Sequence, residues 1–235
     1  MTEGGDLEGG TLYVVATPIG NMGDVTLRAL EVLRGCDALA AEDTRRTRQL
    51  LTRYEIPRPR TLLSLHEHNE EHSAQRIAGL LEGGAKVALC SDAGTPLISD
   101  PGYRTLQLVV EQGFPVVAIP GPSAAVAALS ISALPPSSFT FKGFPPRKPG
   151  PRKRFFEVDA ELPHTLVVYE SPHRLARMLA DALEVLGDRD ACVCIDLTKK
   201  FEKAHRGTLS ALAEEFDGVT VRGELTVVIE GDQRR

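Results

Sequence analysis

The stretch of this chain that says most about its fold is Ser91-Asp92-Ala93-Gly94-Thr95-Pro96-Leu97-Ile98-Ser99-Asp100-Pro101-Gly102. It follows an apolar run, residues 86–90, that is typical of a strand, and it precedes a helical pattern over residues 103–112. A small-residue loop with acidic side chains is therefore expected at the carboxyl end of a strand, where open α/β sheets bind their ligands. Gly94 permits close approach of the backbone, and Asp92 is able to accept hydrogen bonds from a ribose or an amine.

Two similar loops, residues 17–24 and 120–124, also follow strand-like runs, and three such loops indicate one ligand pocket. Strands are expected at residues 12–16, 37–41, 61–65, 85–90 and 115–119. Helices are expected at residues 25–34, with Asp24 as N-cap, and at 44–54, 70–81, 103–112 and 123–131. This alternation predicts an α/β fold with a mostly parallel sheet covered on both faces.

A Pro/Ser-rich break at residues 133–138 predicts a domain boundary. Beyond it, strands are expected at residues 139–142, 165–169, 191–197 and 224–229, and helices at 174–186 and 209–216. The antiparallel pairing expected there favours a second α/β lobe with a mixed sheet. The expected organisation is a disordered tail at 1–10, an N-terminal α/β lobe at 11–134 and a C-terminal α/β lobe at 135–235.

The composition excludes several classes of protein. A net charge of −5 argues against a surface coated with basic residues, although a local basic patch is compatible with it. The four cysteines are too scattered for a disulfide framework and are expected to be core thiols. We find no secretion signal and no apolar run long enough for a membrane helix, so a cytoplasmic location is expected.

The generic motifs for dinucleotides, for P-loop nucleotides and for α/β-hydrolases are absent from the sequence. The segment His66-Glu67-His68-Asn69-Glu70-Glu71-His72 looks like a metal cluster. Its ligands cannot all converge from one helix, and no cysteine is near to complete a zinc set. A polar loop that leads into a helix, with Asn69 as N-cap, and a substrate contact are the two interpretations left open.

Two basic segments stand out in this acidic chain. Arg45, Arg46, Arg48 and Arg53 lie on one short predicted helix. The second segment is a Pro/Gly-rich loop with interleaved aromatic residues, and its cations are Lys142, Arg147, Lys148, Arg152, Lys153 and Arg154. A solvated charged surface would explain both segments, but basic loops with aromatic residues also bind phosphate backbones and splayed bases.

Taken together, these segments resemble the RsmI family of bacterial 16S rRNA (cytidine-2′-O)-methyltransferases, within the tetrapyrrole methylase superfamily. The matching segments follow one another in the family's order over residues 10–231. They are residues 12–21, 41–45, 65–69, 91–102, 120–124, 143–146, 169–174, 197–202 and 223–224. The resemblance implies two α/β lobes, S-adenosylmethionine in the cleft between them, a homodimer and the small ribosomal subunit or its 16S rRNA as partner.

Carried over by position, the resemblance also implies cofactor-binding residues from both lobes. In the first lobe these are Pro18, Ile19, Asp92, Gly94, Thr95, Ser123 and Ala124, and in the second Tyr169, Gly223, Glu224 and Leu225. Arg45, Arg46, His68 and the cations of residues 142–154 are the expected RNA contacts. The family commonly has Arg-Glu where this chain has Ile195-Asp196. Many relatives also carry a helical C-terminal extension, and in place of that extension residues 142–154 are our candidate RNA surface.

A ribose hydroxyl is a poor nucleophile, so a nearby base or a cation that stabilises the alkoxide should help its methylation. Lys199 is the candidate cation, and Glu170, Asp43 and Asp100 are the candidate bases. No metal is required for this chemistry. One alternative is a methyltransferase of the same fold that acts on a tetrapyrrole precursor, and a second is a non-catalytic RNA- or ribosome-binding protein.

Overall fold

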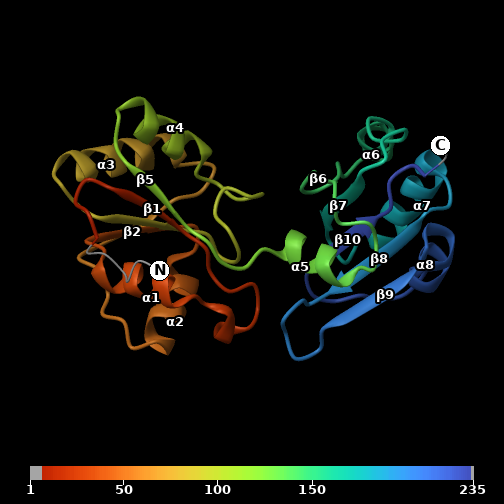
Figure 1. Cartoon of the computed structure of the whole chain (residues 1–235), viewed down its shortest axis with the longest axis horizontal. Coiled ribbons are helices and arrows are strands. Elements are labelled where there is room, and N and C mark those ends of the chain that lie inside the picture. Colours follow the sequence, from red (N-terminus) through yellow and green to blue (C-terminus); the bar gives the residue numbers. More distant parts are fainter. Residues whose placement is uncertain (1–6, 234–235) are drawn as a thin grey trace. The chain divides into compact units, whose positions relative to one another are not determined.

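The computed structural model describes residues 7–233, and the contacts between residues divide the chain into two compact units (Figure 1). The first unit comprises residues 1–123 and the second residues 124–235. Each unit has its own sheet and its own hydrophobic core.

In the described part of the first unit, five parallel strands form one sheet in the order β3-β2-β4-β1-β5. The strands are β1 (Leu12–Val15), β2 (Ala38–Ala41), β3 (Thr61–Ser64), β4 (Val87–Cys90) and β5 (Val116–Ile119). The helices are the 3-10 helix η1 (Met22–Asp24), α1 (Leu27–Gly35), α2 (Thr44–Arg53), α3 (Glu70–Glu82) and α4 (Tyr103–Glu111). The predicted parallel α/β sheet is confirmed.

Helices cover both faces of this sheet, with α1 and α2 on one face and α3 and α4 on the other (Figure 1). Successive residues of a strand point to opposite faces, and β1 shows this directly. Tyr13 and Val15 pack with the apolar side chains of α1 and α2, whereas Leu12 and Val14 pack with those of α3 and α4. The continuous apolar run of each strand therefore fills two cores.

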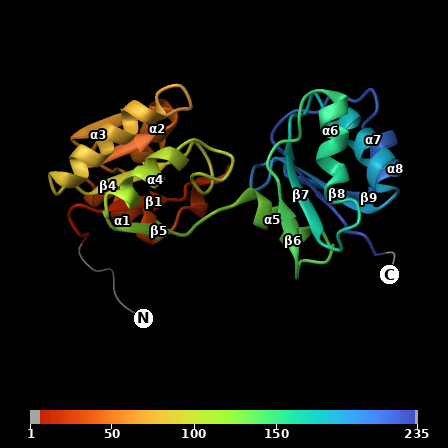
Figure 2. The ribbon, with the colours of Figure 1, turned by 90° about the horizontal axis from the view of Figure 1, so that it is seen from above.

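The second unit contains a mixed sheet in the order β6-β7-β10-β8-β9, in which only the β6–β7 pair is parallel among the described strands. Its strands are β6 (Phe139–Phe141), β7 (Thr165–Glu170), β8 (Asp190–Ile195), β9 (Lys203–Thr208) and β10 (Leu225–Ile229). Its helices are α5 (Ala124–Ile131), α6 (Pro149–Glu157), α7 (Leu175–Leu186) and α8 (Leu209–Phe216). Helices α6, α7 and α8 pack on one face, and α5 contacts β7 and β10 (Figure 2).

The structure differs from the sequence prediction at both ends of the first unit. Helix α5 was expected in the first lobe, but the division falls after Ser123 because α5 packs on the second sheet. Residues 1–6 of the expected disordered tail lie outside the described residues. Of the rest, Leu7 packs beside the core of α1 and α2, and the Gly10 N–H donates to the Ala85 carbonyl at 3.1 Å.

The cap of α1 was predicted incorrectly. Asp24 belongs to η1, and Thr26 is the N-cap, because its side chain accepts a hydrogen bond from the Ala29 N–H. Asn69 does stand at the N-cap of α3, but its side chain bonds to the backbone of His66 and Ser64 instead of capping the helix.

Two elements of the second unit were missed. Helix α6 occupies part of the expected basic loop, because Pro149 stands in its first turn, where the missing N–H costs nothing. Strand β9 was missed because its sequence, Lys203 to Thr208, has no apolar alternation. A polar edge strand of this kind discourages pairing with other chains.

The helical conformation of residues 149–157 changes the role of several predicted RNA contacts. Arg152 is 2% exposed, and its guanidinium donates to Asp181 on α7 and to the Arg147 carbonyl. Lys142 forms an ion pair with Asp159. Arg152 and Lys142 therefore stabilise the fold, and we withdraw both as RNA contacts. Arg147, Lys148 and Arg154 are exposed.

None of the helices in residues 7–233 combines the length and the apolar character that crossing a bilayer demands.

The substitution Arg152→Ala should lower the free energy of unfolding by about 3 kcal/mol, because it leaves the mostly buried Asp181 carboxylate with only Lys153, 4.0 Å away, as a partner. Arg154→Ala, on the exposed side of the same helix, is the matched control and should change stability by no more than about 0.5 kcal/mol. Urea denaturation followed by circular dichroism measures both values. Equal losses for the two variants would contradict the assignment of Arg152 to the core.

Candidate active site

The loops that carry the predicted cofactor contacts of the first unit leave its sheet at one edge. The five strands are parallel, so their carboxyl ends lie together, and residues 16–26, 42–43, 65–69, 91–102 and 120–123 all follow such an end. We refer to these five segments as the carboxyl-edge loops. This edge is where open α/β sheets place their ligand sites.

Backbone hydrogen bonds fasten three of the carboxyl-edge loops to one another. Thr17 and Gly94 exchange two hydrogen bonds, with N···O distances of 2.9 and 3.0 Å. The Thr17 hydroxyl also donates to the Ser91 carbonyl, and the Thr95 hydroxyl donates to the Pro122 carbonyl at 3.1 Å. The loops after β1, β4 and β5 therefore form one connected surface, while the ligand pocket expected from the three small-residue loops stays a prediction.

Gly94 is required at the centre of this surface. Its φ of +81° lies in the left-handed region, which a side chain disfavours. An added Cβ would also lie 3.4 Å from the Ile19 side chain and 3.7 Å from the Pro122 carbonyl oxygen. Ile19, Gly94 and Pro122 are therefore neighbours, and Gly94 is buried between them with its N–H and carbonyl both bonded to Thr17.

Asp92 has a structural role that the sequence did not reveal. One of its carboxylate oxygens accepts a hydrogen bond from the Asp43 N–H at 2.8 Å, and the other lies 3.5 Å from Arg46 Nε. Asp92 thus joins the loop after β2 to the loop after β4. An ionised carboxylate has roughly four acceptor positions, so Asp92 retains capacity for a ligand.

Asp100 and Glu42, two acidic groups near Asp92, have raised pKa values. Burial raises the pKa of Asp100 to about 6, a hydrogen bond from Ser91 opposes the shift, and the charge of Asp92 adds to it. Burial also raises the pKa of Glu42, with further contributions from Asp92 and Asp100. Sequence reasoning missed Glu42, although its position directly after β2 was a usable signal.

Asp43 is a poor candidate for a general base. Its side chain caps α2 by accepting from the Arg45 N–H at 2.8 Å, and it also forms an ion pair with the Arg45 guanidinium. These hydrogen bonds lower the pKa of Asp43 to about 2. A carboxylate with so low a pKa has little tendency to take a proton near neutral pH, so we withdraw Asp43 from the catalytic set.

In the second unit, Lys199 lies between two carboxylates. Its ammonium group is 2.9 Å from Asp196 and 3.0 Å from Glu224. Burial lowers the pKa of Lys199, but hydrogen bonds to Asp196 and Glu224 more than compensate and raise it above its ordinary value. Lys199 is therefore a fixed cation at neutral pH.

The predicted contacts Gly223 and Glu224 lie beside this cation. The Glu224 N–H donates to Asp196 at 3.2 Å, and the Asp196 N–H donates to the Glu224 carbonyl at 2.9 Å. Gly223 has a φ of +99°, and an added Cβ would be 2.3 Å from the Asp196 carboxylate, so only glycine fits. Asp196, which departs from the family pattern, thus positions Lys199 and packs against Gly223.

Tyr169 and Glu170 occupy opposite faces of the second sheet. The Tyr169 ring packs against Phe141 and Phe144, with centroid distances of 4.8 and 5.5 Å. Glu170, by contrast, is 2% exposed and forms an ion pair with Arg174. Burial raises the pKa of Glu170, while the Ser171 N–H and Arg174 oppose the shift. Because its carboxylate is buried and one of its oxygens is paired with Arg174, we withdraw Glu170 as a base.

The remaining predicted contacts are distributed over both units. Pro18, Thr95 and Ser123 lie in the carboxyl-edge loops, Ala124 begins α5, and Leu225 begins β10 opposite Glu170 and Ile195. Arg45 and His68 are exposed, and Lys153 pairs with Glu184. Within residues 7–233, no group of three or more His, Cys, Asp or Glu side chains has the arrangement of a metal site.

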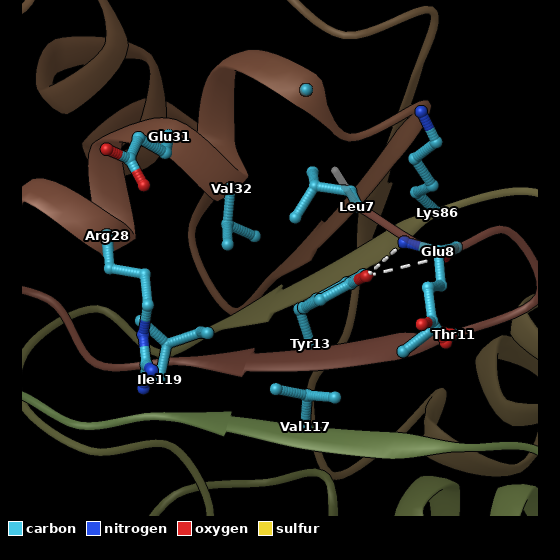
Figure 3. A pocket seen from close by; sticks show the side chains of 11 residues that line it. Leu7, Glu8, Thr11, Tyr13, Arg28, Glu31, Val32, Lys86, Val117 and Ile119 are labelled. Atoms are coloured by element: carbon cyan, nitrogen blue, oxygen red, sulfur yellow. Dashed lines mark hydrogen bonds between the residues drawn. The ribbon is translucent and has the colours of Figure 1, made fainter. Parts of the chain in front are cut away.

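A pocket of about 590 Å³ lies on the α1 side of the first sheet, away from the carboxyl-edge loops (Figure 3). Its walls come from α1, β1 and β5 and from the segment before β1, where the Glu8 N–H donates to the Tyr13 hydroxyl at 2.7 Å. Arg28 and Lys86 are balanced there by Glu8 and Glu31, so the lining favours no single charge of ligand.

The profile of the Tetrapyrrole (Corrin/Porphyrin) Methylases matches residues 11–213 of this chain. Solved structures with the same fold include a cobalt precorrin-4 methyltransferase, with a TM-score of 0.70, 16% identity and coverage of 94% of this chain and 95% of that one. A diphthine synthase gives a TM-score of 0.71 at 15% identity, covering 94% of this chain and 90% of that one. At these identities the likeness concerns the fold alone.

Curated relatives are much more similar in sequence. The ribosomal RNA small subunit methyltransferase I of Mesorhizobium japonicum is 49% identical, over 93% of this chain and 74% of the relative. The proteins of the same name from Halalkalibacterium halodurans and Thermotoga maritima are 46% and 42% identical, each over 95% of this chain and over 76% and 100% of the relative. The chain belongs to the tetrapyrrole methylase family and, within it, to the ribosomal RNA small subunit methyltransferases I. It is therefore a methyltransferase.

The raised pKa of Asp100, about 6 against an ordinary 3.8, predicts how stability depends on pH. The folded protein favours protonated Asp100, so this contribution is complete below about pH 3.8 and is lost as the pH rises through about 6. The free energy of unfolding of the wild type should fall over that range relative to Asp100→Asn. Denaturant titrations at half-unit pH steps test this, with the exposed Asp217→Asn as control, and parallel curves for Asp100→Asn and wild type would contradict the prediction.

Proposed function

We propose that this methyltransferase transfers a methyl group from S-adenosylmethionine to the ribose 2′-hydroxyl of a cytidine in the decoding region of small-subunit rRNA. The observation that carries the proposal is the identity of 42–49% with small-subunit rRNA methyltransferases over at least 93% of the chain. The proposed acceptor, a cytidine ribose, comes from the family resemblance of the motifs.

The carboxyl-edge loops fit such a cofactor chemically. Gly94 has no side chain to obstruct the surface between Ile19 and Pro122, and Asp92 offers acceptors to the hydroxyls of a ribose or to an amine. We assign binding of S-adenosylmethionine in the first unit to Pro18, Ile19, Asp92, Gly94, Thr95 and Ser123. Ala124, Tyr169, Gly223, Glu224 and Leu225 are the proposed contacts of the second unit. When bound, the cofactor supplies a methyl group on a sulfonium, which is an excellent leaving group.

Asp100 is the proposed general base. Its pKa of about 6 leaves it mostly ionised at neutral pH while keeping it basic enough to take the proton of a hydroxyl. Lys199, held protonated between two carboxylates, is the proposed source of electrostatic stabilisation for the developing alkoxide. Of the four catalytic candidates from the sequence, Asp100 and Lys199 are the two whose protonation states suit the proposed roles.

RNA contacts are assigned to exposed cations. Arg147, Lys148 and Arg154 are exposed at and before α6, and Arg45 is exposed on α2. Arg46, His68 and Lys153 remain proposed contacts, although Arg46 and Lys153 also have acidic partners. This modest set of cations favours an assembled small subunit over naked rRNA as substrate, because recognition by shape then adds to charge.

We further propose a homodimer in the cytoplasm, where ribosomal subunits are assembled. The edge strand β5 supports the dimer, since Val116 and Val117 are exposed on it. An apolar edge strand left open in solution invites pairing with another chain.

No observation of comparable weight favours the alternative of a tetrapyrrole precursor as substrate. The neighbours named for cobalt precorrin-4 and uroporphyrin-III are 16% and 22% identical to this chain. The second alternative, a non-catalytic RNA-binding protein, would require loss of cofactor binding.

The direct test of the proposed function uses methyl-labelled S-adenosylmethionine with purified small ribosomal subunits, with naked rRNA and without RNA. Wild-type protein should label the rRNA of the subunits, and Asp92→Ala should lose cofactor binding and labelling together. Asp217→Ala, an exposed carboxylate, is the control. Cofactor binding without labelling of either RNA would overturn the rRNA assignment and bring the tetrapyrrole alternative forward.

The role of Asp100 predicts a pH–rate profile. The rate of methyl transfer by the wild type should rise with pH through about 6, as Asp100 loses its proton. Asp100→Asn should lower kcat by about 100-fold or more and abolish this rise, because an amide cannot accept the proton. Binding of S-adenosylmethionine, measured by calorimetry, should be nearly unchanged. An Asp100→Asn variant with wild-type kcat and the same pH profile would remove Asp100 from the mechanism.

A further inference from the structure

The loop of the β8–β9 hairpin, residues 196–202, presents an aromatic ring to solvent. Phe201 is 72% exposed, which makes it the most exposed of the eight phenylalanines of the chain. Aromatic rings supply much of the energy of cores and interfaces, so an open phenylalanine in an ordered loop suggests a ligand. The methyl-transfer chemistry assigned above makes no use of this ring.

The loop that carries Phe201 is ordered. Asp196 and Thr198 adopt left-handed backbone conformations, with φ of +51° and +67°. The Lys199 N–H donates to the Asp196 carbonyl at 3.0 Å, and the Glu202 N–H donates to the Lys199 carbonyl at 3.1 Å. The Glu202 carboxylate also accepts from the Thr198 N–H. A ring on so constrained a loop loses little conformational entropy when a ligand stacks on it.

Cations surround the ring on its own segment of chain. The Lys200 ammonium lies 5.4 Å from the centroid of the Phe201 ring, within the range of a cation–π contact. Lys199 precedes it, and the exposed Lys203 begins β9 two residues later. Lys199 is already held between Asp196 and Glu224, so Lys200 and Lys203 are the exposed cations that would face a partner. An apolar protein partner would have to desolvate these two ammonium groups, whereas the phosphates of a nucleic acid would neutralise them.

We propose that Phe201 is a stacking platform for an unpaired base of the rRNA substrate, with Lys200 facing the adjoining phosphate. The assignment rests on the proposed rRNA methylation and deepens it by naming a residue that positions the RNA. Single-stranded RNA is commonly recognised by stacking of splayed bases on aromatic rings, with cations along the backbone. The ring touches substrate but takes no part in proton or methyl transfer.

The chain contains no tryptophan, so Phe201→Trp introduces one fluorescent reporter at the proposed site. Titration of this variant with small ribosomal subunits should quench the tryptophan emission as a base stacks on the indole. Val110→Trp, at an exposed position of α4 in the first unit, is the matched control and should keep its emission. Equal emission changes in the two variants, or none in Phe201→Trp, would overturn the proposal.

Kinetics separate stacking from a structural role. Phe201→Ala should lower kcat/KM for the small subunit by roughly 5- to 150-fold, mainly through KM, since stacking on one base is of that strength. Phe201→Tyr and Phe201→Trp should restore most of the activity, and binding of S-adenosylmethionine should be unchanged in all three variants. A wild-type KM for Phe201→Ala would reject the platform, as would a changed oligomeric state in sedimentation. A wild type that labels no RNA would instead reject the proposed function itself.

Discussion

The five strands of the first unit are parallel, and the rest of the candidate site depends on this constraint. Parallel pairing brings the carboxyl ends of all five strands to one edge, so that loops far apart in sequence become neighbours. The paired hydrogen bonds between Thr17 and Gly94 then hold the loops after β1 and β4 in register. Asp92 adds the loop after β2 through the Asp43 N–H. The site is thus held together by backbone hydrogen bonds and by short polar side chains that bond to backbone groups of neighbouring loops.

Much of this arrangement was predictable because strands and glycine-rich loops leave strong local patterns. The sheet and the three small-residue loops at its carboxyl edge follow from residues 12–24, 86–102 and 115–124, whereas the hydrogen bond from the Asp43 N–H to Asp92 does not. Helix α6 escaped prediction because Pro149-Gly150-Pro151 looks like a loop, although proline is tolerated in a first turn. The pairing of Arg152 with Asp181 could not be predicted, because the two residues lie far apart in the sequence and meet only through tertiary packing. Glu170 pairs with Arg174, four residues later, but the sequence did not reveal that Glu170 is buried.

Charge in this protein is organised by pairing. An acidic chain that binds RNA needs cations without acidic partners. Arg152 and Lys142, however, form ion pairs with Asp181 and Asp159. Lys199 is likewise held between Asp196 and Glu224. The exposed cations at the start of α6 and in the β8–β9 loop are therefore the ones proposed to contact a phosphate backbone. Near Asp92 the opposite arrangement holds: burial, with a smaller contribution from the charge of Asp92, raises the pKa of Asp100 to about 6.

The central claim is that the methyl group reaches a ribose and not a base or a tetrapyrrole. Nucleoside analysis by mass spectrometry, on 16S rRNA from small subunits treated with the enzyme and S-adenosylmethionine, tests this claim most directly. The account predicts a gain of 2′-O-methylcytidine that maps to the decoding region and is absent without enzyme. A methyl group on a nucleobase, or no methylated nucleoside above the untreated control, would contradict it.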